Sequence, residues 1–576
     1  MGKSTNTGEM ILDGLKTLEY RGYDSWGIAI KKGNKLEVEK KVGKIGDSKI
    51  TLGNSEIGVG HTRWATHGGV TVENAHPHLD CKNQIAVVHN GIIENFEELK
   101  KELIKKGHKF ISETDTEVFP HLIEENLKKE GFASSVRDSF NVLKGLNAFV
   151  VVYAVSKEII AVKNGSPLVV GLGKDGLFIS SDSIGLIKYT RDMFFLKDNQ
   201  MIILGEKPEL LELPGGTKLP FSFERIDWKI EEVSMGKYKH FMIKEIFEQP
   251  KVIRKIASEK DEIGALGKVI KNSRGTFFIG AGTAYYAAIA GAYFFSKIAQ
   301  KHVNTQPASE FNYLEDFLTD ESLIIALSQS GETIDVVEPL QRAKTKGSKI
   351  ASITNVLGST IYRMSDYKLL LNAGPEKAVA STKAYVAKLS VLLMLAYSMN
   401  SEIDKASEVL LKAADEIDRL LEHIEDIKRI TKSLSHTRDI YLIGRGLSYS
   451  LALEGAMKIK EVSYVHAEGF AGGELKHGPI ALISKNTPCI VLAPNDETYG
   501  AIMSNAAEVK ARGGMIIGLS YQNSSLFDHF IEIKDIQEGS IIAQIVPLQL
   551  IAYFLTLLKK YDPDKPRNLA KSVTVK

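Results

Sequence analysis

Glu454, Lys458 and Glu461 form a set of titratable residues whose spacing suits acid–base chemistry. They stand at positions i, i+4 and i+7 of "LALEGAMKIKEVSY" (451–464), so a helix would place all three side chains on one face. Carboxylates next to a bound carbonyl compound can move a proton as general acid and base. The alternative is a surface salt-bridge ladder worth ~0.2–0.5 kcal/mol per pair.

The glycine-rich segment "HAEGFAGGELKHGP" (466–479) follows this helix. Its four glycines favour close packing of the backbone around a ligand. His477 is flanked by Lys476 and Gly478 and does not stand on an apolar face. This setting disfavours a buried structural histidine.

A second polar segment, "LSQSGET" (327–333), follows an apolar run that is typical of a buried strand. Ser328, Gln329, Ser330 and Thr333 supply three hydroxyls and an amide at the start of the next helix. Free backbone N–H groups and hydroxyls at a helix N-terminus bind anions. Ser330 or Thr333 could instead only cap the helix, but six consecutive polar and glycine residues favour phosphate binding.

The C-terminal tail "PRNLAKSVTVK" (566–576) raises a similar choice. Terminal residues are usually frayed, so a solvated basic tail is one interpretation. The other is that Lys571 acts as an amine nucleophile, which requires desolvation or a cationic neighbour to lower its pKa. Burial between neighbouring domains would supply the desolvation and Arg567 would supply the charge.

An internal repeat organises the C-terminal half of the chain. Gly280 and Gly282 of "FFIGAGTAYYAA" recur as Gly444 and Gly446 of "YLIGRGLSYSLA", a shift of 164 residues (444 − 280). Each copy alternates short apolar runs with helical patterns, which predicts two doubly wound α/β domains with parallel sheets. Ligands bind at the carboxyl ends of such strands. The second copy has the acidic Asp496 where the first has hydroxyls, so only the first should hold a phosphate.

The N-terminal third has short alternating strands and polar loops, with helices expected at 94–107 and 115–130. The loops 60–69, 89–95 and 112–117 concentrate Arg, Trp, His, Asn and Asp, residues that often bind ligands. The pair Asn90–Gly91, inside 89–95, is either an ordinary turn or an oxyanion hole made of a side-chain amide and a backbone N–H.

The composition limits the possible partners. The chain has 576 residues, with 73 Lys and Arg against 71 Asp and Glu, so the net charge is +2 and does not indicate nucleic acid as a partner. Two cysteines exclude a disulfide framework and fit a cytoplasmic protein. Apolar runs such as "LSVLLMLAY" (389–397) are far shorter than a membrane span, so we expect no membrane partner.

Several longer motifs carry a resemblance to a known family. "LEYRGYDS" (18–25), "HTRWATHG" (61–68), "NAHPH" (74–78), "VVHNGIIEN" (87–95) and "SETDTE" resemble the glutaminase domain of N-terminal-nucleophile amidotransferases. "LSQSGET", "NAGPEKAVASTKA" (372–384), "LEGAMKIKE" (453–461), the segment 466–479 and the tail resemble the tandem sugar-isomerase half of isomerising glutamine–fructose-6-phosphate aminotransferases. The resemblance runs from about residue 9 to the C-terminus.

The resemblance implies an α/β fold, with an αββα glutaminase domain followed by two tandem doubly wound sugar-isomerase (SIS) domains. The expected boundaries are 1–220 for the glutaminase domain, 221–262 for a linker and entry helix, 263–400 and 431–562 for the SIS domains, 401–430 for a helical connector, and 563–576 for a catalytic tail.

The resemblance also implies a reaction: the formation of glucosamine 6-phosphate from fructose 6-phosphate and glutamine, the first step of hexosamine synthesis. It implies no cofactor and no metal, and a homodimer formed through the isomerase half. The residues that would bind glutamine are Arg63, Trp64, Thr66, His67 and Asp115. Asn90 and Gly91 would form the oxyanion hole, and Arg21 would lie near the nucleophile. Released ammonia would cross a buried channel to the sugar site.

For the sugar half, the resemblance implies binding of fructose 6-phosphate by Thr283, Ser328, Gln329, Ser330, Thr333, Val379 and Ser381. His477 would assist ring opening, and Lys571 would form a Schiff base with the C2 carbonyl. Glu461 would move the proton from C1 to C2, supported by Lys458 and Glu454.

The chain departs from the family pattern at its start. Members of the family begin, after removal of Met, with a cysteine nucleophile on the first strand, whereas this sequence begins "MGKSTNTGEM". Cys81 and Cys489 are wrongly placed to replace it, and Ala284 stands where a phosphate-contacting serine is common. An ammonia-dependent or isomerase-only enzyme is therefore an alternative to the glutamine-dependent one. A non-catalytic sugar-phosphate-binding regulator is a third, and the presence of Glu461, His477 and Lys571 together argues against it.

Overall fold

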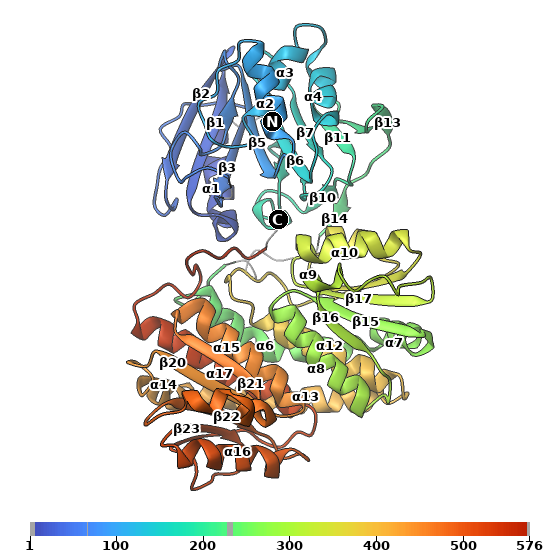
Figure 1. Cartoon of the computed structure of the whole chain (residues 1–576). Coiled ribbons are helices and arrows are strands. Elements are labelled where there is room, and N and C mark those ends of the chain that lie inside the picture. The colour runs from blue at the N-terminus through green and yellow to red at the C-terminus, as the bar shows by residue number, and fades with distance from the viewer. Residues whose placement is uncertain (1–5, 66, 227–233, 573–576) are drawn as a thin grey trace. The chain divides into compact units, whose positions relative to one another are not determined.

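The computed structural model describes residues 6–65, 67–226 and 234–572. The chain divides into two compact units, one ending at Ser234 and the other spanning Met235–Lys571, with Ser572 grouped with the first (Figure 1). Each unit has its own sheets and its own hydrophobic core.

The first unit contains three antiparallel sheets within its described residues. A three-stranded sheet has the order β2-β1-β3, a four-stranded sheet the order β14-β10-β8-β9, and a seven-stranded sheet the order β13-β12-β11-β7-β6-β5-β4. The strands are β1 (Ser25–Lys32), β2 (Lys35–Val42), β3 (Gly58–Arg63), β4 (His78–Leu79), β5 (Ile85–Gly91), β6 (Asn147–Tyr153), β7 (Ile159–Lys163), β8 (Val169–Gly173), β9 (Gly176–Ser180), β10 (Asp192–Phe195), β11 (Gln200–Leu204), β12 (Glu209–Glu212), β13 (Thr217–Leu219) and β14 (Glu224–Arg225).

Alternating side chains of the seven-stranded sheet build two separate cores. Val87, Phe149 and Val151 face one side and pack with residues of the helices α2 (Phe96–Lys105), α3 (Val118–Asn126) and α4 (Phe132–Asn141). Val88 and Val150 face the other side and pack against the smaller sheets. Helix α1 (Thr7–Leu18) covers the outer face of the three-stranded sheet (Figure 1). This layering confirms the predicted αββα arrangement, which follows from the period of two along each strand.

Helices α2 and α3 are both shorter than predicted, and α3 starts only at Val118. The residues before it are held in a turn by side chains. Asp115 accepts a hydrogen bond from the backbone N–H of Ile93, and Glu117 accepts bonds from the backbone of Ile111 and Ser112. Carboxylates that bond loop amides in this way compete with helix formation.

The second unit contains two parallel five-stranded sheets in its described residues, with orders β16-β15-β17-β18-β19 and β21-β20-β22-β23-β24. The orders are equivalent position by position, which confirms the predicted repeat of doubly wound domains. The strands are β15 (Gly275–Gly280), β16 (Asn304–Pro307), β17 (Ser322–Ser328), β18 (Lys349–Thr354), β19 (Tyr367–Leu370), β20 (Asp439–Gly444), β21 (His466–Ala471), β22 (Pro488–Ala493), β23 (Met515–Ser520) and β24 (His529–Glu532).

The repeated glycines have a geometric cause. Gly282 and Gly446 precede the first helix of each copy and have φ angles of +53° and +54°. Residues other than glycine rarely adopt this backbone conformation. The same turn from strand to helix is therefore built twice.

Helices cover both five-stranded sheets, and most of them share one continuous core, whereas the helix Tyr499–Ala511 packs into a separate core with β22 and β23. The helices are α6 (Phe241–Ser258), α7 (Lys260–Asn272), α8 (Thr283–Lys297), α9 (Ala308–Phe311), α10 (Ile334–Thr345), α11 (Thr360–Met364), α12 (Lys383–Ser398), α13 (Ile403–Glu422), α14 (Ile424–Lys432), α15 (Leu447–Ser463), α16 (Tyr499–Ala511) and α17 (Ser540–Leu558). Helices α13 and α14 occupy the segment predicted as a connector.

Helix α17 corrects the expectation that every apolar run is short. The stretch Gln537–Leu558 is long and apolar enough to cross a membrane by length and composition alone. However, 89% of its most apolar window is buried inside the protein. The helix packs against α15, α14 and α13, as a central core helix does.

Candidate functional site

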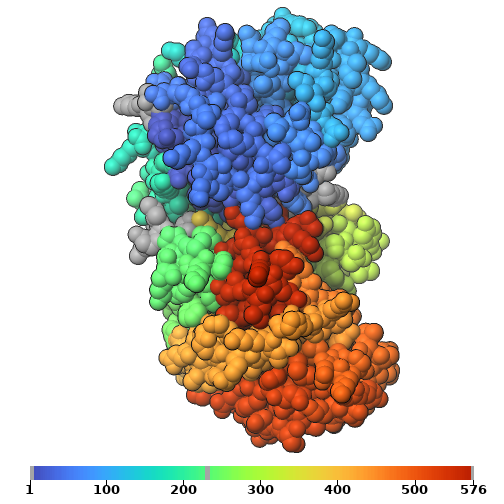
Figure 2. Space-filling view, turned by 90° about the vertical axis from the view of Figure 1, so that its left-hand side faces the viewer, coloured from blue at the N-terminus to red at the C-terminus, as the bar shows by residue number. Residues whose placement is uncertain are grey.

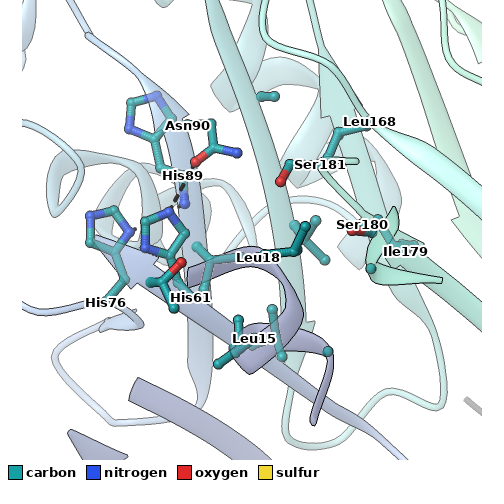
Figure 3. Close-up of a pocket in the computed structure, with 18 of the residues that line it drawn as sticks. Leu15, Leu18, His61, His76, His89, Asn90, Leu168, Ile179, Ser180 and Ser181 are labelled. Carbon is teal, nitrogen blue, oxygen red and sulfur yellow. Dashed lines mark hydrogen bonds between the residues drawn. The ribbon is translucent and has the colours of Figure 1, made fainter. Parts of the chain in front are cut away.

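A pocket in the first unit collects the residues predicted to bind glutamine. It is lined by segments of α1, β3 and β5, by the loops after β3 and before α3, and by residues 166–168 and 177–181 (Figure 3). The predicted residues that line it are Arg21, Arg63, Trp64, His67, Asn90, Gly91 and Asp115. Thr66 lies outside the described residues. The structure thus brings together side chains from four separate sequence motifs.

Several of these side chains already have protein partners. The Arg63 guanidinium donates to the carbonyl oxygens of His67, Gly68 and Gly69, so it holds the loop at the pocket rim. Arg21 Nη1 forms an ion pair with Asp182 Oδ2 at 3.1 Å. These contacts fix the shape of the pocket wall.

Asn90 lies near the end of β5, where an oxyanion hole was one of two interpretations. Its Oδ1 lies 3.0 Å from Nε2 of His61 (Figure 3). With Oδ1 engaged by a ring N–H, the amide group of Asn90 can donate to a ligand in the pocket. Asn90 and Gly91 belong to the strand, so the alternative of an ordinary turn is wrong.

Three histidines in this pocket were quoted in motifs but given no role by the sequence analysis. The rings of His61 and His76 stack at 4.4 Å between centroids, and His89 lies between Thr116 Oγ1 and Asn147 Oδ1. Desolvation lowers the pKa of His61 to about 4 and lowers the pKa of His76 and His89 as well. Neutral, hydrogen-bonded rings form a polar but uncharged pocket wall. The motif "NAHPH" was the available signal for His76.

Neither cysteine is among the described residues that line this pocket. Cys81 lies in the turn after β4, and Cys489 is buried in β22 of the second unit. The structure agrees with the sequence analysis that both are wrongly placed to attack a bound glutamine.

In the second unit, helix α15 presents the predicted acid–base residues on one face. Lys458 Nζ lies 3.4 Å from Glu454 Oε1 and 2.5 Å from Glu461 Oε2. It also donates to Oγ1 of Thr283, at the start of α8, at 3.1 Å, and Thr283 Oγ1 donates to Glu454. Glu454 and Lys458 are fully buried, so the alternative of a surface salt-bridge ladder is wrong.

The buried carboxyl and ammonium groups influence one another's titration. Desolvation raises the pKa of Glu454 to about 7, although Lys458 opposes this shift. Burial also works against the charge of Lys458, but Glu454 and Glu461 together raise its pKa above the usual value. The cluster therefore holds an ammonium group next to a carboxyl that can exchange a proton near neutral pH.

The loop after β17 places the predicted phosphate-binding residues at the carboxyl end of the first parallel sheet. Ser328 Oγ accepts from the N–H of Gly331 at 2.9 Å, and Ser330 Oγ accepts from the N–H of Glu332 at 3.2 Å. Thr333 precedes α10, and its side chain makes no capping hydrogen bond among the described residues. Because β15 and β17 are neighbours, this loop and the Gly282–Thr283 turn occupy the same sheet edge. The backbone carbonyl of Gln329, in the same loop, accepts from the N–H of Asn355.

Lys571 is buried against a carboxylate that the sequence analysis did not assign. Its Nζ lies 2.6 Å from Oε2 of Glu376, and the two side chains are 4% and 0% exposed. Ser381 Oγ donates to the same oxygen at 3.0 Å, while the other oxygen accepts from the N–H groups of Thr382 and Ala384. Glu376 stands in the motif "NAGPEKAVASTKA", which was the available signal.

The tail that carries Lys571 is fixed at several points of the same unit. The carbonyl of Asp564 accepts from Val379, and its carboxylate accepts from the first N–H groups of α6. In Figure 2 the red C-terminal segment lies beside the green start of this unit. The backbone N–H of Arg567 donates to the hydroxyl of Tyr464 at 2.7 Å. The interpretation of a frayed basic tail is therefore wrong for the described part of the tail.

Arg567 does not take the position that the sequence analysis gave it. Its guanidinium stacks 4.3 Å from the ring centroid of Tyr464. The group that Lys571 contacts is the carboxylate of Glu376. Burial of the lysine agrees with the expectation, but its charged partner is an anion and not a cation.

Other ionisable groups surround this ion pair. The pKa of Glu376 falls to about 2, because the charge of Lys571 and hydrogen bonds outweigh burial. Burial and the neighbouring Glu376 raise the pKa of Glu245 to about 8. Burial lowers the pKa of Lys388 to about 8. The site thus combines ionised and neutral groups away from water.

The structure does not join His477 to the sugar cluster. It is exposed at the end of the 3-10 helix Gly472–His477, which packs against α16. Val379, by contrast, is 9% exposed and lies next to the tail through its bond to Asp564.

Comparisons with known proteins agree with this architecture. Residues 269–398 and 433–559 match the SIS domain, and residues 61–188 match the glutamine amidotransferase domain. The fold and the two sites thus define a two-SIS-domain protein with an N-terminal amidotransferase domain. The chain belongs to the family of isomerizing glutamine–fructose-6-phosphate aminotransferases, whose members are similar to it over nearly their full length.

Relatives in three organisms illustrate the similarity. The glutamine–fructose-6-phosphate aminotransferases of Thermococcus kodakarensis and Pyrococcus horikoshii are each 43% identical to this chain, with 98% of both chains covered. That of Aquifex aeolicus is 41% identical, with 98% of this chain and 97% of the relative covered.

Solved structures are similar to the second unit. The C-terminal domain of glucosamine-fructose-6-phosphate aminotransferase from Francisella tularensis is 33% identical, with a TM-score of 0.55, and covers 58% of this chain and 100% of that one. Tagatose-6-phosphate ketose/aldose isomerase from Escherichia coli has a TM-score of 0.52 at 18% identity over 57% of this chain and 96% of that one, which shows the shared fold alone.

Proposed function

We propose that the chain converts fructose 6-phosphate into glucosamine 6-phosphate with nitrogen from glutamine, the first step of amino-sugar synthesis. The observation that carries the proposal is the buried ion pair of Lys571 and Glu376. A binding protein has no need of a buried lysine held at one point, whereas an enzyme that forms a Schiff base with a ketose does, with the ammonium group losing its proton before the amine attacks.

The sugar is proposed to bind at the carboxyl end of the first parallel sheet. Ser328, Gln329, Ser330 and Thr333 hold the phosphate at the N-terminus of α10, where backbone N–H groups attract anions. Thr283 approaches from the neighbouring turn, and Val379 and Ser381 line the sugar. This arrangement presents the ketose carbonyl to Lys571.

The proton transfer is proposed to use the α15 cluster. Glu461, which is 24% exposed and contacts Lys458, removes the proton from C1 and returns it at C2. Lys458 holds Glu461 in position, and the fully buried Glu454 fixes Lys458 in turn. His477 is proposed to assist ring opening.

Glutamine is proposed to bind in the pocket of the first unit. Arg63, Trp64, His67 and Asp115 surround it, Asn90 and Gly91 stabilise the oxyanion, and Arg21 lies near the nucleophile, which neither Cys81 nor Cys489 is placed to supply. The neutral histidine wall supports the proposal, because it offers hydrogen bonds to an uncharged amide without attracting ions.

The test is to supply the purified 576-residue chain with fructose 6-phosphate and either glutamine or ammonium, and to measure glucosamine 6-phosphate. Product with glutamine supports the full proposal. Product formed with ammonium but not with glutamine would restrict the proposal to the reaction of the sugar half. Absence of product with both donors, in protein that still binds fructose 6-phosphate, would overturn it.

The chain is further proposed to be a cytoplasmic homodimer formed through the second unit. Both cysteines are free thiols, which supports a reducing compartment. The exposed His477 supports an assembly in which a second copy completes the sugar site. Mixing the inactive variants Lys571→Ala and His477→Ala should then restore activity, and activity that stays absent in verified mixed dimers would contradict this.

A further inference from the structure

Four side chains from three segments of the first unit meet at one point outside the glutamine pocket. Cys81 lies in the turn after β4, His108 follows α2, and His121 and Glu124 stand one turn apart on α3. Each offers one potential ligand atom, and these atoms all lie within 4.8 Å of one another. We expected no metal from the sequence, in which Cys81 and His108 stand apart from the pair on α3.

Five of the six distances between the ligand atoms fit the edges of a tetrahedron, and the sixth, from Cys81 Sγ to Glu124, is within 4.8 Å. Cys81 Sγ lies 3.5 Å from Nδ1 of His108 and 3.5 Å from Nδ1 of His121, and the two nitrogens are 3.3 Å apart. Glu124 Oε2 lies 3.2 Å and 3.7 Å from the same two nitrogens. Zinc bonds of roughly 2.0–2.3 Å in a regular tetrahedron separate their ligand atoms by about 3.3–3.6 Å.

Each imidazole has a carboxylate on its outer side, which is hydrogen-bonded to the ring of His108 and lies farther from the ring of His121. His108 Nε2 lies 2.8 Å from Glu125 Oε1, and His121 Nε2 lies 3.7 Å from Glu117 Oε1. Each ring therefore turns its Nδ1 toward the common point. A carboxylate behind a histidine ligand is the usual companion of a zinc site, because it fixes the tautomer and increases the basicity of the ring.

A backbone hydrogen bond and the burial of three of the four side chains also suit a metal site. The backbone N–H of Lys109 donates to Cys81 Sγ at 3.4 Å, which helps to fix the position of the sulfur. The side chains of His108, His121 and Glu124 are 4%, 1% and 9% exposed, while Cys81 is exposed and offers a route for an ion.

We propose that Cys81, His108, His121 and Glu124 bind a zinc ion. A thiolate with two imidazoles and a carboxylate in tetrahedral array favours zinc over magnesium or calcium, which prefer oxygen ligands and higher coordination numbers. Because the protein supplies all four ligands, the ion has a structural and not a catalytic role.

The ion would tie the turn after β4 and the segment after α2 to helix α3. Glu117 extends this connection, because it faces His121 and also accepts hydrogen bonds from the backbone of Ile111 and Ser112. The loop held in this way leads directly to Asp115 of the glutamine pocket. The inference goes beyond the proposed function and does not depend on it.

The test is the metal content of the full-length chain, incubated with zinc and a reducing agent and then desalted. We expect about one zinc ion per chain in the wild type. Cys81→Ser and His121→Gln should each bind zinc more than tenfold more weakly, and Glu125→Gln about 10–100-fold more weakly through loss of the carboxylate bonded to His108. Cys489→Ala, which removes the other thiol of the chain, should retain the ion.

A second measurement uses the wild-type chain, so it tests the proposal even if the variants fail to fold. Cobalt added to the wild-type chain should give the visible bands of a tetrahedral ion and a sulfur-to-cobalt charge-transfer band, and zinc should displace it. Zinc should also slow the alkylation of Cys81 by iodoacetamide. Absence of bound zinc and of the cobalt bands in the wild type would overturn the proposal, as would an unchanged zinc content in folded Cys81→Ser.

Discussion

The ammonium group of Lys571 lies 2.6 Å from the carboxylate of Glu376, and both side chains are shielded from water. The two residues are 195 positions apart (571 − 376), so the contact exists only when the C-terminal tail is docked on the second unit. A buried ion pair gains little stability over an apolar pair because both charges are desolvated, whereas removal of one partner is strongly destabilising. Its value is positional, because it holds the amine of Lys571 at a defined point beside Val379 and Ser381.

The first prediction concerns the nucleophile. Borohydride added in the presence of fructose 6-phosphate should reduce a Schiff base and attach the sugar to Lys571, which mass spectrometry of the C-terminal peptide would detect. Lys571→Arg keeps the charge but cannot form the Schiff base, so amino-sugar synthesis should be lost. Lys565→Arg, on the same tail, serves as the matched control and should remain active. Labelling of a different lysine would contradict the assignment.

The second prediction concerns pH and the same ion pair. The folded pKa of Glu376 is about 2, below the ordinary 4.5, so ionisation of this group stabilises the fold. That contribution is fully present above pH 4.5 and is lost as the pH falls toward 2. The shift corresponds to about 3 kcal/mol of free energy of unfolding.

Glu376→Gln mimics the protonated acid and isolates this effect. The variant should be less stable than the wild type by about 3 kcal/mol at pH 7, measured by urea denaturation, and the difference should shrink below pH 4.5. Because the neutral amide of this variant cannot form an ion pair with the ammonium group, the tail should also be cleaved faster by trypsin at Lys571. A stability difference that stays constant from pH 7 to pH 3 would contradict the ion-pair explanation.

The third prediction separates the roles of Glu454 and Lys458. Burial raises the pKa of Glu454 to about 7, so this carboxyl is mostly protonated at pH 6 and Glu454→Gln replaces it with a neutral group of similar shape. The free energy of unfolding at pH 6 should change by less than about 1 kcal/mol. Lys458→Met instead leaves Glu454 and Glu461 without their counter-charge and should cost about 3–5 kcal/mol at pH 8.

The pH dependence of Lys458→Met gives an internal check. Its destabilisation should be smaller at pH 5, where protonation of Glu454 removes the uncompensated charge. Urea denaturation at the two pH values measures the difference. Equal destabilisation at pH 5 and pH 8 would show that packing, and not charge, is what Lys458 contributes.

The residues of the acid–base helix could be predicted because their relation is local. The spacing of Glu454, Lys458 and Glu461 depends only on helix geometry. Glu376 escaped prediction, since nothing near it in the sequence indicates that its partner is a residue of the tail. The zinc ligands escaped for the same reason: Cys81 and His108 become neighbours of His121 only through the packing of α3 on the sheet.

The fold could be predicted in those parts of the chain where the sequence has a regular pattern of apolar residues and glycines. The repeated strand–glycine–helix units of the second unit follow from apolar runs and from glycines such as Gly282 and Gly446, which need a positive φ. Helix α17 has no such signal, because every residue from Ser540 to Thr556 is buried and no polar face marks a period of about 3.6 residues. Its helical state and burial therefore required the tertiary structure.

The last prediction concerns the phosphate loop. Gly331 has a φ of +67°, and a Cβ atom there would collide with Oγ of Ser359. Gly331→Ala should therefore displace the loop of Ser328, Ser330 and Thr333, whose hydroxyls and N–H groups are proposed to hold the phosphate. We expect the KM for fructose 6-phosphate to rise by at least about tenfold, in line with the loss of one charge-assisted hydrogen bond.

Gly347→Ala is the matched control, because Gly347 also has a positive φ, of +83°, and lies in the same domain at the end of α10 away from the loop. Both variants carry a backbone strain of about 1 kcal/mol, so both should lose similar stability from this source. Only Gly331→Ala should raise the KM, measured by steady-state kinetics with ammonium as the nitrogen donor. Equal KM values for the two variants would show that the phosphate is bound elsewhere.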